Sequence, residues 1–225
     1  MKFHIIRFFD LFFSILALIV FLPLFLIVGI VLKFTGEGKI FYRQTRIGQY
    51  GKRFKLLKFA TMKKNSPFIG SGELTIPDDP RVFPFGRFLR KSKINELPQL
   101  INVMIGQMSI IGPRPQTEQY FGLYLPEQQR LISSVKPGLS GVGSIIFSDE
   151  ESILAKVEDP IEFDRNVIMP YKAEVECWFV KNLSLKLYFE LIAITVIRLL
   201  FYKSNIRKAL LSRLPGIPPE LKDLI

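Results

Sequence analysis

Two adjacent polar residues, Asn95 and Glu96, begin a short segment in which apolar residues recur at helical spacing. The apolar residues that share this helical face are Leu97, Leu100, Ile101 and Met104. Asn95 is a good N-cap for such a helix, and Pro98 is tolerated in its first turn. Because the free amides and the dipole at a helix N-terminus attract phosphate, the segment predicts a phosphate-binding site at Asn95 and Glu96.

Basic side chains lie on both sides of this segment in the sequence. The upstream ones are Arg81, Arg87, Arg90, Lys91 and Lys93. Downstream, residues 112–115 (Gly-Pro-Arg-Pro) form a rigid turn that carries Arg114. Arginine suits two-point contact with phosphate, and a Mg²⁺ ion bound by one carboxylate would complete a pyrophosphate site. On residue types alone, an ordinary capped helix beside a solvated basic face remains an open alternative.

The composition narrows the class of protein. A chain of 225 residues suits one compact domain with appendages, and its net charge of +11 suits nucleic acid or an anionic membrane surface as a partner. No nucleic-acid-binding motif is found, so nucleic acid is not expected as a partner. With one His and one Cys, a His-based metal site, a Ser-His-Asp triad and an internal disulfide are not expected either. The chemistry must therefore come from carboxylates, amides and cations.

Residues 11–32 contain no charged side chain. As a helix this run would extend about 33 Å, enough to cross a bilayer core. Basic residues flank it on both sides, and because positive charge favours the cytoplasm, both ends favour the same side of the membrane. Pro23 predicts a kink in the middle. We therefore expect a re-entrant membrane helix over residues 1–36, with a simple spanning anchor as the alternative.

The remaining chain mixes a small sheet with helices, so the predicted fold is α+β and mostly helical. The expected elements are a β-hairpin over residues 39–62, a short helix after Pro126, a turn at 136–141, a helix over 161–182 broken near Pro170, and an interfacial or core helix over 183–203. We expect residues 37–203 to form a catalytic domain on the cytoplasmic face and residues 204–225 to form a basic, Pro-rich tail.

Three motifs follow one another along the chain: residues 79–90 (Asp-Pro-Arg-Val-Phe-Pro-Phe-Gly-Arg-Phe-Leu-Arg), 96–100 (Glu-Leu-Pro-Gln-Leu) and 112–115. They closely resemble the bacterial sugar transferase family of monotopic polyprenyl-phosphate phosphoglycosyl transferases. The likeness extends on both sides, to residues 7–10, 41–48, 58–62 and 136–141. Their order matches the family over about residues 5–200. The resemblance implies an enzyme of the cytoplasmic face of the bacterial inner membrane, where surface glycan assembly begins.

The resemblance also implies a ping-pong reaction. A carboxylate attacks the β-phosphate of a UDP-sugar, UMP leaves, and polyprenyl (undecaprenyl) phosphate collects the sugar phosphate, with Mg²⁺ neutralising the pyrophosphate. The residues it assigns are Glu96 and Asn95 to catalysis and metal binding, and Lys58, Arg81, Arg90 and Arg114 to substrate phosphate. The expected partners are the UDP-sugar, polyprenyl phosphate and membrane lipid, and a homodimer remains open.

One departure from the family pattern touches the chemistry. The family has an Asp-Glu pair before Leu-Pro-Gln-Leu, and this chain has Asn95-Glu96. An amide is a poor nucleophile, although its oxygen can still bind a hard cation. Glu96 as the nucleophile is the favoured hypothesis; direct transfer without a covalent intermediate, a substitution introduced to trap substrate, and an inactive chain that acts as a membrane scaffold or ligand binder remain alternatives.

Overall fold

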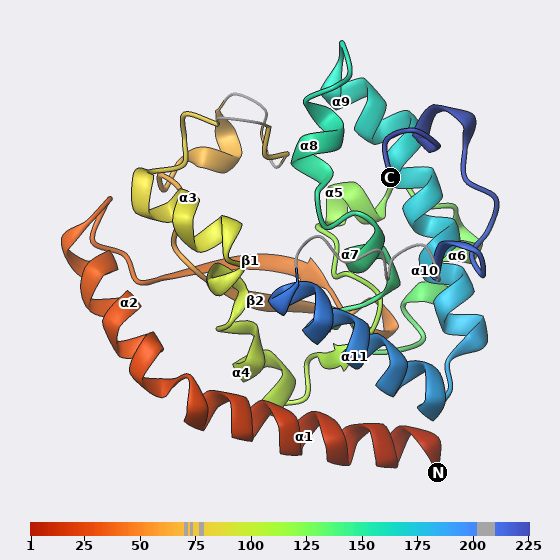
Figure 1. Ribbon diagram of the computed structural model, residues 1–225, viewed down its shortest axis with the longest axis horizontal. Coiled ribbons are helices and arrows are strands. Elements are labelled where there is room, and N and C mark those ends of the chain that lie inside the picture. The colour runs from red at the N-terminus through yellow and green to blue at the C-terminus, as the bar shows by residue number, and fades with distance from the viewer. Residues whose placement is uncertain (70–71, 73, 77–78, 202–209) are drawn as a thin grey trace.

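The computed structural model describes residues 1–69, 72, 74–76, 79–201 and 210–225 (Figure 1). Its helices are α1 (Lys2–Val20), α2 (Leu22–Phe34), α3 (Pro84–Lys91), α4 (Gln99–Met104), α5 (Glu118–Phe121), α6 (Pro126–Ile132), α7 (Val142–Ile146), α8 (Glu150–Leu154), α9 (Pro160–Phe163), α10 (Met169–Asn182) and α11 (Leu185–Leu200). Its strands are β1 (Phe41–Ile47), β2 (Arg53–Phe59), β3 (Ser109–Ile111) and β4 (Gly138–Ser140). The predicted α+β, mostly helical fold is confirmed.

Strands β1 and β2 form the predicted antiparallel hairpin, paired from Phe41 opposite Phe59 to Ile47 opposite Arg53. Alternate residues of β2 are buried, and Phe54 and Leu56 pack in a core cluster with residues of α4 and the segment after it. Asn102 in α4 fixes this contact, since its amide oxygen accepts from the Leu57 backbone N–H (3.0 Å) and its amide nitrogen donates to the Lys55 carbonyl (2.9 Å). The hairpin therefore holds Lys58 beside the start of α4.

Strands β3 and β4 pair in parallel, with Ser109 opposite Gly138 and Ile111 opposite Ser140. The prediction of a turn at residues 136–141 is therefore wrong for 138–140. Its Pro-Gly sequence is a local turn signal, but the backbone groups here bond to a segment distant in sequence: Gly112 donates to the Ser140 carbonyl (2.9 Å). This pairing fixes the turn that carries Arg114.

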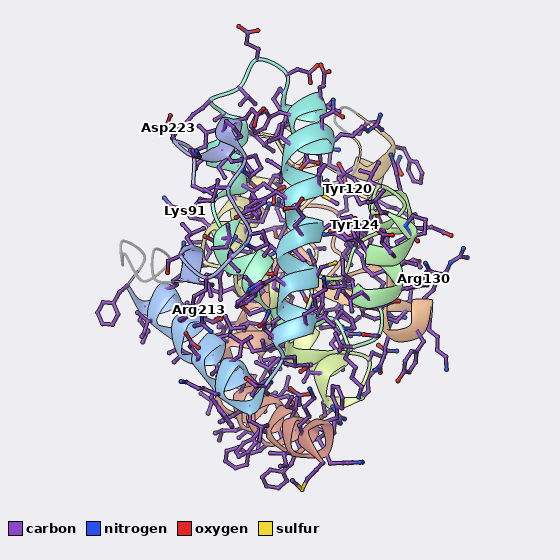
Figure 2. All side chains as sticks on the ribbon, turned by 90° about the vertical axis from the view of Figure 1, so that its right-hand side faces the viewer. Lys91, Tyr120, Tyr124, Arg130, Arg213 and Asp223 are labelled. Carbon is purple, nitrogen blue, oxygen red and sulfur yellow. The ribbon has the colours of Figure 1, made fainter. Side chains whose placement is uncertain are left out.

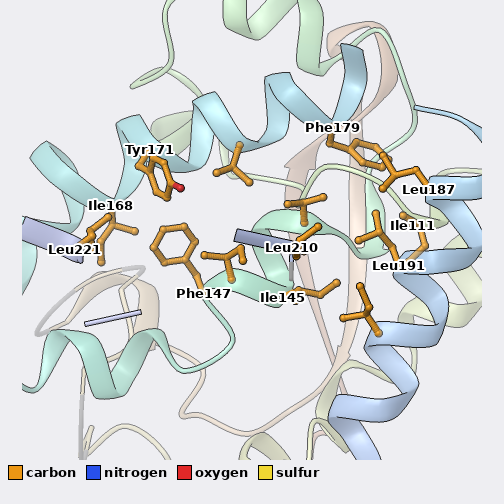
Figure 3. Close-up of a cluster of buried hydrophobic side chains, with 14 of the residues drawn as sticks. Ile111, Ile145, Phe147, Ile168, Tyr171, Phe179, Leu187, Leu191, Leu210 and Leu221 are labelled. Carbon is orange, nitrogen blue, oxygen red and sulfur yellow. The ribbon is translucent and has the colours of Figure 1, made fainter. Parts of the chain in front are cut away.

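Helix α10 forms the spine of the main core (Figure 3). Side chains from α7, α10 and α11 meet there, including Ile145, Tyr171 and Leu191, each at most 3% exposed. The predicted helix over 161–182 is confirmed as α9, a π-helical turn at Asp164–Ile168 and α10, so the break falls before Pro170. Of the predicted tail, residues 204–209 lie outside the described part, and Leu210 and Leu221 are buried in this core.

Helices α1 and α2 meet in a bend at Phe21, two residues before Pro23, so the predicted kink is confirmed. In Figure 1, α1 lies along the lower edge of the molecule and α2 turns upward from its end. Among the described residues, α1 is the one helix long and apolar enough to cross a membrane, by length and composition. Much of its apolar surface is exposed, including Phe12, Ile19 and Val20.

Two charged residues attach α1 to the rest of the chain. Asp10, 1% exposed, accepts hydrogen bonds from the Ser109 hydroxyl (2.9 Å), the Ile110 backbone N–H (2.8 Å) and the Tyr188 hydroxyl (2.8 Å). Arg7 donates to carbonyls at the end of α4 (2.6 and 2.8 Å). Because buried charges need such partners, these bonds fix how α1 lies against the domain.

Helix α11 has a buried and an exposed part. Leu187, Tyr188 and Leu191 are buried in the main core, while Leu199 and Leu200 near its end are exposed. The predicted helix over residues 183–203 is thus found as α11 and packs in the core; residues 202 and 203 lie outside the described part of the chain.

Candidate active site

The segment that carries Asn95 and Glu96 begins at Lys93, which has a left-handed backbone (φ 59°). A 3₁₀ turn follows at Ile94–Glu96, and α4 begins only at Gln99. The prediction that Asn95 is the N-cap of a helix is therefore wrong: Asn95 lies inside the tight turn, and the helix of six residues that follows has Pro98 as its N-cap. The side chain of Asn95 is turned inward instead. It is 6% exposed, and its amide oxygen is buried with no hydrogen-bond partner in the described structure.

The carboxylate of Glu96 lies between two cations. Its Oε1 accepts a hydrogen bond from Arg114 Nη2 (3.2 Å) and another from Lys58 Nζ (3.5 Å). Lys58 comes from β2 and Arg114 from the turn after β3, so three segments distant in sequence converge here. Both cations contact Oε1. In contrast, Oε2 accepts no hydrogen bond from the described residues, and it is not among the buried atoms that lack a partner. Glu96 therefore has one anchored oxygen and one oxygen left for a ligand.

The electrostatics of this clamp keep Glu96 ionised. Burial alone would raise the pKa of the Glu96 carboxyl, but Arg114, Lys58 and Lys93 hold this pKa far below its usual range. Burial also lowers the pKa of Lys58 to about 7; Glu96 opposes this shift and Arg114, Arg46 and Arg90 add to it. The site thus has an excess of positive charge around a single carboxylate, which favours an anionic ligand.

Further cations border the clamp. Arg46 on β1 donates to the Pro115 carbonyl (3.2 Å), which holds the Gly-Pro-Arg-Pro turn against the hairpin. Arg90 at the end of α3 is 26% exposed and pairs with Glu151 (3.0 Å). Because Arg90 contributes to the low pKa of Lys58, it lies within electrostatic reach of the clamp. Of the predicted phosphate-binding residues, the structure thus brings Lys58 and Arg114 into contact with Glu96 and leaves Arg90 paired with Glu151 at the edge of the clamp.

Arg81 is the exception among the predicted phosphate-binding residues. It is 5% exposed, and its guanidinium is paired with Asp79 (2.5 Å). It also donates to backbone carbonyls of the preceding loop, at Ser66 (2.7 Å), Ile69 (2.9 Å), Gly72 (2.5 Å) and Leu74 (2.7 Å). Its donors are used to hold that loop, so the structure does not place Arg81 among the substrate-binding cations.

A buried polar network lies behind Arg114, and sequence analysis did not find it. Glu176 on α10, 3% exposed, accepts from the Arg114 backbone N–H (3.1 Å), and burial raises the pKa of its carboxyl to about 7. Lys172, one turn earlier, pairs with Glu150 (2.6 Å). Figure 2 shows Tyr120 and Tyr124 beside α10 on the side where α5 and α6 lie. The sequence signal that could have indicated this network is the spacing of Lys172 and Glu176, which lie four residues apart and so share one face of the helix.

A carboxylate clamped by cations beside a bent apolar helix is the arrangement expected of an enzyme that handles phosphate groups next to a membrane. Comparison with known families gives the same class: the bacterial sugar transferase family model matches residues 1–202. The chain belongs to the bacterial sugar transferase family.

Three proteins with named functions or products are similar to this chain in sequence. The exopolysaccharide production protein ExoY of Sinorhizobium fredii is 39% identical over 174 residues, which cover 71% of this chain and 76% of that protein. The UDP-glucose:undecaprenyl-phosphate glucose-1-phosphate transferase of Escherichia coli is 37% identical over 177 residues, 76% of this chain but 36% of that protein. An Aeromonas hydrophila UDP-N-acetylgalactosamine-undecaprenyl-phosphate N-acetylgalactosaminephosphotransferase is 31% identical, over 70% of this chain and 38% of that protein.

Proposed function

We propose that this protein transfers a sugar-1-phosphate from a UDP-sugar to undecaprenyl phosphate, the first membrane step of a bacterial surface glycan. Membership of the family and the names of two relatives support this reaction class. The observation that carries the proposal is the clamp: Glu96 is held ionised through Oε1 by Lys58 and Arg114 and keeps Oε2 free. A fixed carboxylate amid surplus positive charge suits attack on a pyrophosphate.

In the proposed first step, Oε2 of Glu96 forms a bond to the β-phosphorus of the UDP-sugar. The bond from that phosphorus to the bridging oxygen breaks, and the bridging oxygen leaves with its electron pair as part of UMP. In the second step, a phosphate oxygen of undecaprenyl phosphate attacks the same phosphorus, and the Glu96 carboxylate is released. Lys58 and Arg114 are placed to stabilise the charge that develops on the phosphoryl oxygens.

A magnesium ion fits the residues present at the site. The buried amide oxygen of Asn95 has no hydrogen-bond partner in the described structure, and the carboxylate of the next residue, Glu96, is held ionised; amide and carboxylate oxygens are the hard ligands that Mg²⁺ prefers. We propose that Asn95 and Glu96 hold Mg²⁺, which would neutralise pyrophosphate charge. Asn95→Asp, which adds a charged ligand, should lower the Mg²⁺ concentration for half-maximal activity by about tenfold. An unchanged or higher Mg²⁺ requirement would remove residue 95 from the metal site.

We propose that α1 and α2 form a re-entrant hairpin that enters and leaves the inner membrane from the cytoplasmic face. The bend at Phe21, the exposed apolar side chains of α1 and the basic flanks support this placement. The exposed end of α11 would lie at the headgroup layer. The test is labelling of single cysteines at positions 2 and 37 in inside-out vesicles, in a Cys177→Ser background. Labelling of both positions is expected, and labelling of only one would support a spanning anchor.

The reaction itself is tested by UMP release. Purified full-length protein is incubated with undecaprenyl phosphate, Mg²⁺ and each member of a panel of UDP-sugars. Release of UMP with at least one donor, together with formation of a lipid-linked diphosphate sugar, is expected. If UDP-sugars bind without any UMP release, and Asn95→Asp restores release, the chain is instead a catalytically impaired binder, as the replacement of the family's Asp would then explain.

A further inference from the structure

The acidic run at Asp149–Glu151 lies directly beside the cationic site. It has no role in the proposed chemistry, and its sequence alone suggests no more than a helix start. In the structure each residue from 148 to 151 contacts a cation. Lys93 donates to the Ser148 carbonyl (3.4 Å), Arg198 pairs with Asp149 (3.5 Å), Lys172 pairs with Glu150 (2.6 Å), and Arg90 pairs with Glu151 (3.0 Å).

These four cations come from different parts of the fold. Arg90 lies in the last turn of α3, Lys93 precedes the turn that carries Glu96, Lys172 lies on α10 and Arg198 on α11. The segment 148–151 therefore bridges the elements that surround the site, and in Figure 1 α8 lies to one side of α3. Behind the segment, Ile153 and Leu154 of α8 are buried in the main core. The apolar side chains of α8 thus fix the segment to the core, while ion pairs hold its acidic side chains against the surrounding elements.

The four contacts differ in how readily they can open. Glu150 is bound to a lysine that is 9% exposed, so this contact is part of the buried network. The Glu151 side chain is 54% exposed and its partner Arg90 is 26% exposed. Exposed ion pairs are weak, whereas phosphate offers a guanidinium two strong charge-assisted bonds. A pyrophosphate that reaches Arg90 can therefore displace Glu151 at little cost.

We propose that Glu151 acts as a gate on the donor site: it occupies Arg90 in the resting protein and is displaced when the pyrophosphate of the UDP-sugar binds. This deepens the proposed function and rests on it, because Arg90 is taken as a phosphate-binding residue. The gate makes donor binding a competition with an internal carboxylate, so a ligand needs more than a single weak negative charge to open it. Glu151 is a residue that sets affinity and selectivity, not a catalytic residue.

The test is Glu151→Gln in the full-length protein, with the Michaelis constant for the UDP-sugar measured by UMP release. We expect KM to fall about threefold to fivefold, because an exposed ion pair no longer has to be broken, while kcat stays within about twofold. Glu158→Gln is the matched control: it makes the same charge change at an exposed glutamate later in the sequence and should leave KM within about twofold. An unchanged or raised KM in Glu151→Gln overturns the gate.

A second arm shows whether the effect acts through Arg90. Arg90→Gln should raise KM, and adding Glu151→Gln to that variant should then have no further effect. Equal effects of Glu151→Gln with and without Arg90 would contradict the gate.

Calorimetric binding of inorganic pyrophosphate to the same proteins separates the gate from the proposed reaction. If the unaltered protein releases no UMP but Glu151→Gln still tightens pyrophosphate binding, the reaction assignment fails and the gate stands; if turnover is normal and pyrophosphate affinity is unchanged, the gate fails alone.

Discussion

Arg81 and Arg114 are two arginines that each lie next to a carboxylate, yet the structure gives them opposite tasks. The side chain of Arg81 is 5% exposed, and its guanidinium binds Asp79 together with several carbonyls of the loop that precedes it. The side chain of Arg114 is 38% exposed, and within the described part of the chain it donates to Glu96 alone. An arginine whose donors are held by buried partners has none left for substrate, so Arg81 stabilises the loop, whereas Arg114 keeps donors for the site.

Replacing Arg81 should give the largest loss of stability. Arg81→Gln leaves the Asp79 carboxylate, 2% exposed, without its cation, and also leaves backbone carbonyls unsatisfied. Breaking a buried pair from one side costs about 3–5 kcal/mol. We expect that loss in thermal or denaturant unfolding of the purified protein, with the turnover per folded molecule unchanged. A variant that unfolds normally but has lost activity would mean that Arg81 binds substrate after all.

Replacing Arg114 should do the reverse. Arg114→Gln removes one of the two cations on Glu96, and loss of one such charge-stabilising donor typically costs about 10²–10³-fold in rate. Because the Arg114 side chain is 38% exposed, the unfolding midpoint should shift far less than in Arg81→Gln. UMP-release kinetics and thermal unfolding on the same preparations check both halves. A large loss of stability with normal turnover would make the two arginines equivalent.

The pH dependence separates the two cations of the clamp, since Arg114 stays charged and Lys58 does not. The pKa of Lys58 is lowered from 10.5 to about 7, so kcat/KM should fall as the pH rises above about 7 and the Lys58 cation is lost. Stability should move the other way. Between about pH 7 and 10.5 the unfolded chain binds more protons at this lysine than the folded one, so the free energy of unfolding rises with pH.

Lys58→Met is the control for both effects. It should reduce activity at every pH, remove the decline above about pH 7, and flatten the rise in the free energy of unfolding. pH–rate profiles and denaturant titrations at pH 6.5 and 9.5 measure the two curves. An unaltered protein with a flat rate profile between pH 6 and 9 would show that the Lys58 cation is not needed for the reaction.

Local patterns were enough to predict much of the fold. Alternation of residue types predicted the hairpin β1–β2, and Pro23 predicted the bend between α1 and α2. Two errors have different physical causes, and the first is pairing between segments distant in sequence. Residues 138–140 form a strand because residues 109–111 lie beside them, and no turn rule contains that information. The second cause is a local backbone conformation. Asparagine is a residue type typical of an N-cap, but the left-handed backbone of Lys93 starts a tight turn in which the Asn95 side chain points inward.

The candidate site was predictable to a similar depth. The motifs and their order in the sequence predicted Lys58, Glu96 and Arg114 as site residues. In the structure, Lys58 and Arg114 both contact Glu96. A motif cannot show how many donors of an arginine are used elsewhere, so Arg81 was included with the others. Nor could it show that Glu176 supports the Arg114 backbone, since this contact joins α10 to a turn 62 residues away.

The central claim is that the free oxygen of Glu96 attacks the donor, and UMP release without an acceptor tests it most directly. The unaltered protein, Glu96→Gln and the exposed control Glu158→Gln are each mixed with a UDP-sugar and Mg²⁺ but no undecaprenyl phosphate. UMP and the intact protein mass are then measured. The account predicts about one UMP per active site and a phosphosugar adduct in the unaltered protein and the control, and neither in Glu96→Gln. An adduct that persists in Glu96→Gln, or turnover that begins only once the acceptor is present, would contradict it.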